Sequence, residues 1–63
     1  MNINLFRAEL AKNGLTNKQL AEAIGVSEST LYRKIKNNSF GINEVKAIAS
    51  VLHIKNPIPI FFD

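Results

Sequence analysis

The chain has 63 residues, of which 46% are hydrophobic, and it carries a formal net charge of +3. This length predicts one small domain over residues 1–63, whose core must be well packed to be stable alone. The absence of cysteine excludes disulfides and thiolate metal sites, and it fits a reducing, cytoplasmic setting. Because residues 1–12 lack a long apolar core and no apolar run approaches the roughly 20 residues of a membrane span, we expect neither a signal peptide nor a membrane segment. The positive charge suits an anionic partner, although an ordinary solvated surface has the same balance.

The first predicted helix covers about residues 3–13, with Phe6 and Leu10 on one face. The triplet Asn13-Gly14-Leu15 predicts that the helix ends in a Schellman motif, in which Gly14 is left-handed and Leu15 folds back onto Leu10. This stop separates the first helix from the next.

Residues 16–35 predict two short helices, at about 17–24 and 28–36, joined by a tight turn. In each helix, apolar residues four apart form an inner stripe that can close on a shared core. These residues are Leu20 and Ile24 in the first helix, and Leu31 and Ile35 in the second.

Local signals agree on the boundaries of this helix pair. Thr16 and Gln19 fit a capping box at the first helix, and Ser27 is placed to cap the second. Ala21 is small enough for a steep helix crossing, and Gly25 can adopt the positive φ that reverses the chain. The pair has the outline of a DNA-reading helix-turn-helix.

A fourth helix is expected to begin near Gly41 or Ile42, after a polar loop that contains Phe40. Glu44 lies three residues after a glycine cap, as in a capping box. The apolar stripe of this helix consists of Val45, Ile48, Ala49 and Leu52.

The C-terminal residues 56–63 predict either a single helical turn, begun by an Asn56 cap and a first-turn Pro57, or an extended tail. The expected fold class is therefore all-α, a compact domain of four to five helices that contains a helix-turn-helix.

The outward face of the third helix carries the candidate DNA-reading residues. Arg33 forms the densest basic cluster of the chain with Lys34 and Lys36, although complementation of a helix dipole is an alternative explanation. Ser29 and Arg33 lie one turn apart, and Arg33 can donate two parallel hydrogen bonds to guanine. Glu28 is suited either to a helix N-terminus or to accepting a bond from a cytosine amine.

Further polar residues suit contacts with phosphate. The Tyr32 phenol could bond a phosphate or contact a thymine methyl, or its ring could pack against the fourth helix. The other suitable phosphate donors, which are equally ordinary as cap and loop residues, are Asn17, Asn37, Asn38 and Ser39.

Other functional classes have little support in the sequence. His53 is the one histidine and has no cysteine beside it, so it is expected to end a helix rather than to bind a metal. There is no paired nucleophile and base and no glycine-rich phosphate loop, so we expect no enzyme, no cofactor and no small-molecule substrate.

Five segments together resemble the small regulators of phages and mobile elements, and their joint order covers nearly the whole chain. The pattern that resembles the helix-turn-helix of phage Cro and repressor proteins is Leu20-Ala21, Ile24-Gly25-Val26-Ser27 and Ser29-Thr-Leu-Tyr-Arg33, followed by Glu44-Val-x-x-Ile-Ala-x-x-Leu52 and Ile60-Phe-Phe62. Lys34 stands where the family usually has an aliphatic residue.

The resemblance implies a compact repressor-like domain that binds double-stranded operator DNA, usually as a symmetric dimer, and controls transcription. By position, the residues implied to touch bases or the adjoining backbone are Ser27, Glu28, Ser29 and Arg33. Those implied or suited to touch the DNA backbone are Asn17, Tyr32, Lys36, Asn37 and Asn38.

The last aromatic residues form the candidate dimer interface. Phe61 and Phe62 belong to a cluster of large apolar residues, which we expect to be covered from water. One ring is expected to close the core and the other to contribute to a two-fold interface, and the alternative is that both are buried in their own monomer. The rival to a DNA-binding regulator is a protein-interaction module, such as an antitoxin or adaptor with the same fold.

Overall fold

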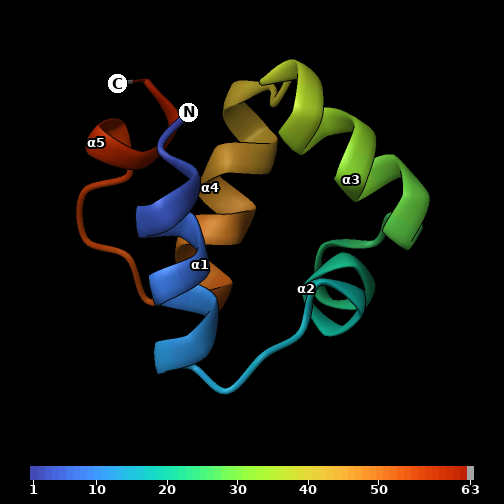
Figure 1. Ribbon diagram of the computed structural model, residues 1–63, viewed down its shortest axis with the longest axis horizontal. Coiled ribbons are helices and arrows are strands. Elements are labelled where there is room, and N and C mark those ends of the chain that lie inside the picture. Colours follow the sequence, from blue (N-terminus) through green and yellow to red (C-terminus); the bar gives the residue numbers. More distant parts are fainter. Residues whose placement is uncertain (63) are drawn as a thin grey trace.

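Five helices make up the computed structural model, which describes residues 1–62 (Figure 1). In chain order they are α1 (Ile3–Lys12), α2 (Asn17–Ile24), α3 (Glu28–Asn37), α4 (Ile42–Val51) and α5 (Ile58–Phe61). No strand occurs in this part of the chain, and the predicted all-α class is confirmed. The predicted bounds differ by one residue at two ends, since α1 stops before Asn13 and α3 continues to Asn37. Over residues 1–62 no helix is long and apolar enough to cross a bilayer.

The four longer helices all end in a Schellman motif, as predicted for α1. In each, the N–H of the residue that follows a left-handed residue donates to a carbonyl five residues earlier. The donor and acceptor pairs are Leu15 and Leu10 at 3.0 Å, Val26 and Ala21 at 3.0 Å, Ser39 and Lys34 at 3.0 Å, and Ile54 and Ala49 at 2.8 Å. The left-handed residues between them are Gly14, Gly25, Asn38 and His53.

The starts of α2 and α3 carry the predicted caps. Thr16 Oγ1 accepts from the Gln19 N–H at 3.1 Å, and Gln19 Oε1 accepts from the Thr16 N–H at 2.9 Å. Ser27 Oγ accepts from the Thr30 N–H at 3.1 Å. These bonds satisfy amides that a helix start otherwise leaves without partners.

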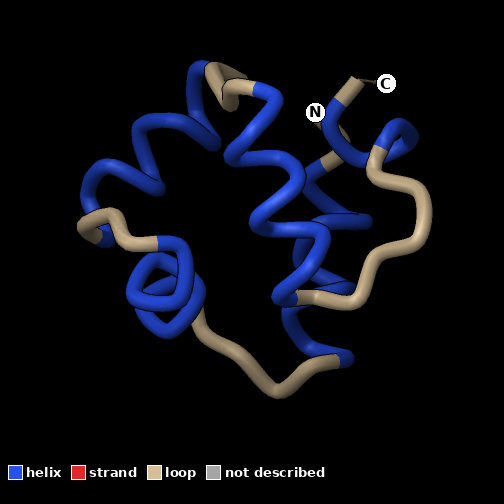
Figure 2. The backbone as a smooth tube through the Cα atoms, turned by 180° about the vertical axis from the view of Figure 1, so that it is seen from behind, coloured by secondary structure: helices blue, strands red, loops and turns tan. Residues whose placement is uncertain are grey.

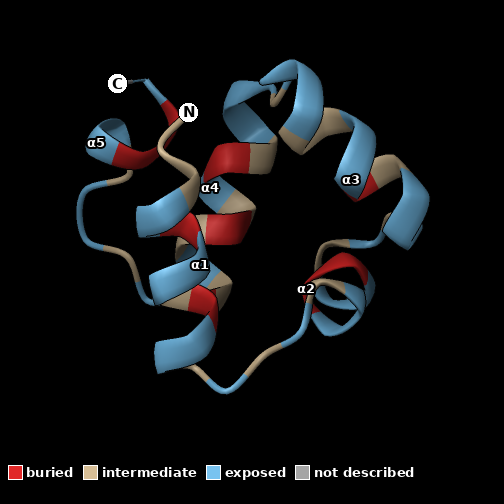
Figure 3. Cartoon of the chain, in the orientation of Figure 1, coloured by how far each residue is buried: buried red, intermediate tan, exposed pale blue. Residues whose placement is uncertain are grey.

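Buried apolar side chains from all five helices form one core. Figure 3 shows the buried segments on each helix. Phe61 on α5 joins this core, because its ring meets the rings of Phe6 and Phe40 edge to face, at centroid distances of 6.3 and 5.5 Å. The full buried set is Phe6, Leu10, Leu20, Ala21, Leu31, Val45, Ile48, Leu52, Ile60 and Phe61.

The N-terminal segment lies beside α5, and views from both sides agree on this (Figures 1 and 2). The Asn2 N–H donates to the Ile60 carbonyl at 2.6 Å, which ties the start of the chain to α5. Asn56 Oδ1 accepts from the Ile58 N–H at 3.2 Å. Of the two expectations for the tail, the helical turn is therefore the one observed, but Pro57 stands at its N-cap position rather than in its first turn, and Asn56 precedes the cap.

The two terminal aromatic rings have different environments. Phe61 is 2% exposed, whereas Phe62 is 56% exposed. The alternative in which both rings are buried in their own monomer is therefore wrong. Of the two rings named as candidates for a dimer interface, Phe61 is enclosed by its own core, and Phe62 is left for contact with another molecule.

Candidate nucleic-acid interface

The turn between α2 and α3 orients α3 so that one side faces the core. Gly25 has a φ of 79°, the left-handed conformation predicted for the turn. Leu20 on α2 and Leu31 on α3 are both fully buried, and α2 packs against both α3 and α4. The inner side of α3 is thereby anchored, and its opposite side faces outward.

The outward face of α3 is polar and basic. Its exposed residues follow a helical spacing, and they are Glu28, Ser29, Tyr32, Arg33 and Lys36. Within residues 1–62 the one ion pair joins Lys34 to Glu44, so Arg33 and Lys36 have no carboxylate partner there. Their positive charges remain available to an anion.

Three hydroxyl groups meet at the start of α3. Ser27 Oγ lies 2.9 Å from Thr30 Oγ1, to which it donates, and 3.2 Å from Ser29 Oγ. Because Ser27 also accepts from the Thr30 N–H, its hydroxyl is largely committed to the cap. Ser29 is exposed, and its hydroxyl is less engaged. Of the two serines, Ser29 is therefore the freer to contact another molecule.

Lys34 differs from the other two members of the basic cluster because its charge is engaged in an ion pair. Its Nζ lies 3.2 and 3.1 Å from the two Glu44 carboxylate oxygens, and Glu44 Oε1 also accepts from the Gly41 N–H at 2.8 Å. The Gly41 hydrogen bond, followed by that from Lys34, lowers the pKa of Glu44 below its ordinary value of 4.5. Lys34 thus links the end of α3 to the start of α4. The capping spacing of Glu44 was a visible signal, but no helical spacing relates Lys34 to Glu44 across the loop.

The α2–α3 unit and its surroundings match a known family. A family model described as helix-turn-helix, of the Cro/C1 type, matches residues 6–55, most of the chain. The chain belongs to this helix-turn-helix family. Comparisons with curated proteins and with solved structures give no match. The family consists of DNA-binding regulators, and the matched span contains α2, α3 and α4 in full.

Two of the residues predicted to contact the DNA backbone line one hollow beside α3. Tyr32 is 51% exposed and lines this hollow of about 190 Å³ together with Asn17, at the start of α2. The other lining residues are Ile3, Phe6, Arg7 and Ile35, so the walls come from α1, α2 and α3 rather than from α4. Asn17 Oδ1 is buried without a hydrogen-bond partner.

The other residues predicted to contact the DNA backbone lie at the end of α3. Asn37 and Asn38 are exposed, and Asn38 has a φ of 49°. Its left-handed conformation ends the helix, so an asparagine here has a structural role whether or not it touches DNA.

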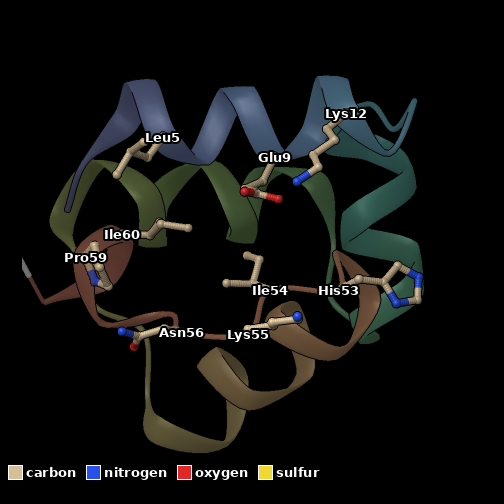
Figure 4. A pocket seen from close by; sticks show the side chains of 9 residues that line it. All are labelled: Leu5, Glu9, Lys12, His53, Ile54, Lys55, Asn56, Pro59 and Ile60. Carbon is tan, nitrogen blue, oxygen red and sulfur yellow. The ribbon is translucent and has the colours of Figure 1, made fainter.

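A larger hollow, of about 350 Å³, lies away from the outward face of α3 (Figure 4). Figure 4 shows Glu9 and Lys12 reaching from α1 toward the wall formed by Ile54 and Ile60. No residue of α2 or α3 lines it. Over the described residues, no three histidine, cysteine, aspartate or glutamate side chains come together as a metal site would require.

Proposed function

We propose that this helix-turn-helix domain is a sequence-specific transcriptional regulator of the Cro-like phage or mobile-element type, and that it reads the major groove with α3. The observation that carries the proposal is the outward face of α3, which is exposed and carries cations without partners among the described residues. An α-helix fits the major groove of B-form DNA, where each base pair presents a distinct pattern of donors and acceptors.

The proposed contacts with base edges or the adjoining backbone come from Ser27, Glu28, Ser29 and Arg33. Arg33 has the strongest chemical case, because its forked donors match the two acceptors of guanine. Ser27 contributes least to base contact, since its hydroxyl already caps α3. The proposed backbone contacts are Asn17, Tyr32, Lys36, Asn37 and Asn38.

The regulator is proposed to act as a symmetric homodimer through Phe62. Leu5 on α1 and Ile58 on α5 are also exposed apolar side chains, with 42% and 60% of their areas exposed, and α1 packs against α5. A two-fold contact there would place two copies of α3 on successive turns of DNA, about 34 Å apart. A palindromic operator would be the consequence.

Selection of a duplex from a random pool, followed by titration at two salt concentrations, tests the proposal. Affinity should fall steeply with salt, because phosphate contacts release counterions. Arg33→Ala should weaken binding to the selected site by roughly 1 to 3 kcal/mol and relax preference at one base pair. Lys36→Ala should instead weaken binding to all duplexes similarly.

Lys55→Ala is the matched control, because Lys55 is exposed on the α4–α5 loop beside the larger hollow. It should leave the base preference unchanged. If Arg33→Ala also left it unchanged, α3 would not be the reader. If the parent chain bound no duplex at either salt concentration, the rival protein-interaction module, favoured by the exposed Phe62 and Ile58, would replace the DNA-binding proposal.

A further inference from the structure

The hollow between α1, α2 and α3 is lined by a basic residue of α1, Arg7, and by two residues proposed to contact the DNA backbone, Asn17 and Tyr32. We infer that Arg7 binds a DNA phosphate together with Asn17 and Tyr32. Residues of three helices would then contact one stretch of the DNA backbone beside the outward face of α3. This inference rests on the proposed DNA-binding function. It adds to the interface a residue from a helix outside the α2–α3 motif.

The lining of the hollow separates polar from apolar groups. Arg7, Asn17 and Tyr32 are its polar members, and the remaining walls come from Ile3, Phe6 and Ile35. Arg7 and Tyr32 are both exposed, so their polar ends are accessible at the rim. An anion that approached this rim would meet donors from three helices.

Each polar member can donate to a phosphate oxygen. The Arg7 guanidinium is permanently charged and forked, which matches phosphate geometry, and the Tyr32 hydroxyl is a further donor. Asn17 buries its Oδ1, which leaves the amide nitrogen as its more accessible end. Over residues 1–62, Arg7 has no carboxylate within ion-pair distance, so a phosphate would not compete with an internal partner.

The buried Asn17 oxygen gives a second reason to place the guanidinium here. A buried acceptor without a hydrogen bond is costly, and Asn17 Oδ1 is such an acceptor. A guanidinium carries five N–H donors. Arg7 makes no hydrogen bond to this oxygen in the structure, but it lines the same hollow and has enough donors for both this oxygen and a phosphate.

Salt-dependent titration of Arg7→Gln tests the inference on both the selected duplex and an unrelated one. Loss of one phosphate contact should reduce the slope of log affinity against log salt by about 0.9 and lower the affinity for both duplexes about fivefold near 0.15 M salt. Arg7→Lys keeps the charge and should retain most of the slope. Thermal unfolding of each variant checks that the fold is intact.

Lys12→Gln is the matched control, because it removes one positive charge from the same helix but lies at the other hollow (Figure 4). It should leave the slope unchanged. Equal slopes for Arg7→Gln and Lys12→Gln would overturn the inference while DNA binding itself stood. A loss confined to the selected duplex would also overturn it, since it would indicate base contact. Absence of salt-dependent binding by the parent chain would overturn both proposals.

Discussion

At the residue scale, the left-handed positions show how the helices of this domain are ended. Gly14 and Gly25 occupy two of these positions, whereas Asn38 and His53 occupy the other two. Glycine adopts positive φ without a Cβ clash, asparagine tolerates it, and histidine does so at a cost. Backbone hydrogen bonds of the Schellman motifs maintain the conformation at all four positions.

Gly25→Val should destabilise the domain because a β-branched residue resists the φ of 79° at the turn. A Cβ added there would meet no atom within 4 Å, so the cost should come from the backbone conformation rather than from a clash. We expect a loss of about 1 kcal/mol or more in the free energy of unfolding, measured by thermal or urea denaturation. Gly25→Asn should lose less, and equal stability of the valine variant would contradict this account of the turn.

His53→Gly should have the opposite effect. Its φ of 55° is strained for histidine but free for glycine, whereas the added flexibility of the unfolded chain offsets part of the gain. We expect a net stabilisation of up to about 1 kcal/mol in urea denaturation. Ser50→Gly, inside α4, should instead destabilise by a similar amount. A loss of stability in both variants would show that His53 contributes through side-chain contacts.

At the element scale, the connection of α3 to α4 depends on a polar link as well as on packing. Leu31 anchors the middle of α3 in the core, and Lys34 near its end bonds to Glu44 in the first turn of α4. Glu44 also caps the start of its own helix through the Gly41 N–H. One carboxylate therefore stabilises a helix start and holds the adjoining helix end.

Glu44→Gln should reveal this link through pH. The pKa of Glu44 is lowered in the folded state, chiefly by the Gly41 hydrogen bond, so its contribution to stability is present above pH 4.5 and is lost as the pH falls through the lowered folded-state value. At pH 7 the variant should be less stable than the parent by about 0.5 to 1 kcal/mol, because glutamine can still accept from Gly41 but cannot pair with Lys34. The difference should shrink in strong acid.

Lys34→Gln supplies the second arm of a double-mutant cycle at pH 7. The loss in the double variant should be smaller than the sum of the two single losses, because both remove the same ion pair. Additive losses, or a parent-to-variant difference that did not change with pH, would contradict the proposed link.

At the scale of the whole molecule, contacts between residues far apart in the sequence hold α1, α4 and α5 together. Asn13 Nδ2 donates to the Leu52 carbonyl at 3.0 Å and so joins the ends of α1 and α4. The Asn2 N–H donates to the Ile60 carbonyl, and Phe61 packs between Phe6 and Phe40. The short α5 therefore completes the core, while leaving Phe62 outside it.

Phe61→Ala and Phe62→Ala should separate the core role of Phe61 from the interface role proposed for Phe62. Loss of the buried Phe61 ring should cost about 3 to 5 kcal/mol, enough to unfold much of a small domain. Loss of the exposed Phe62 ring should change the unfolding free energy by less than about 0.5 kcal/mol. Sedimentation, free and with operator, should show weaker self-association or half-site cooperativity for Phe62→Ala. Unchanged assembly in this variant would place the dimer interface elsewhere.

The sequence was sufficient for features that depend on neighbours along the chain. The capping box at Thr16, the cap at Ser27 and the left-handed Gly14 and Gly25 were all predictable, because each involves backbone groups within a few residues. The apolar spacing likewise predicted helices and buried faces, and the resemblance of five segments indicated the family that the family model confirms. Local chemistry and helical periodicity therefore determined the elements and the position of the helix-turn-helix.

The tertiary structure alone decided which residues meet across elements. The structure pairs Lys34 with Glu44, bridges Asn13 to Leu52 and places Arg7 and Tyr32 on the lining of one hollow. No helical period relates the residues of any of these three pairs. The tertiary structure also decided between Phe61 and Phe62, which are adjacent and chemically identical, so only the direction in which α5 presents each ring could distinguish them. Such contacts depend on how packed helices are placed in three dimensions, and local sequence carries little information about that placement.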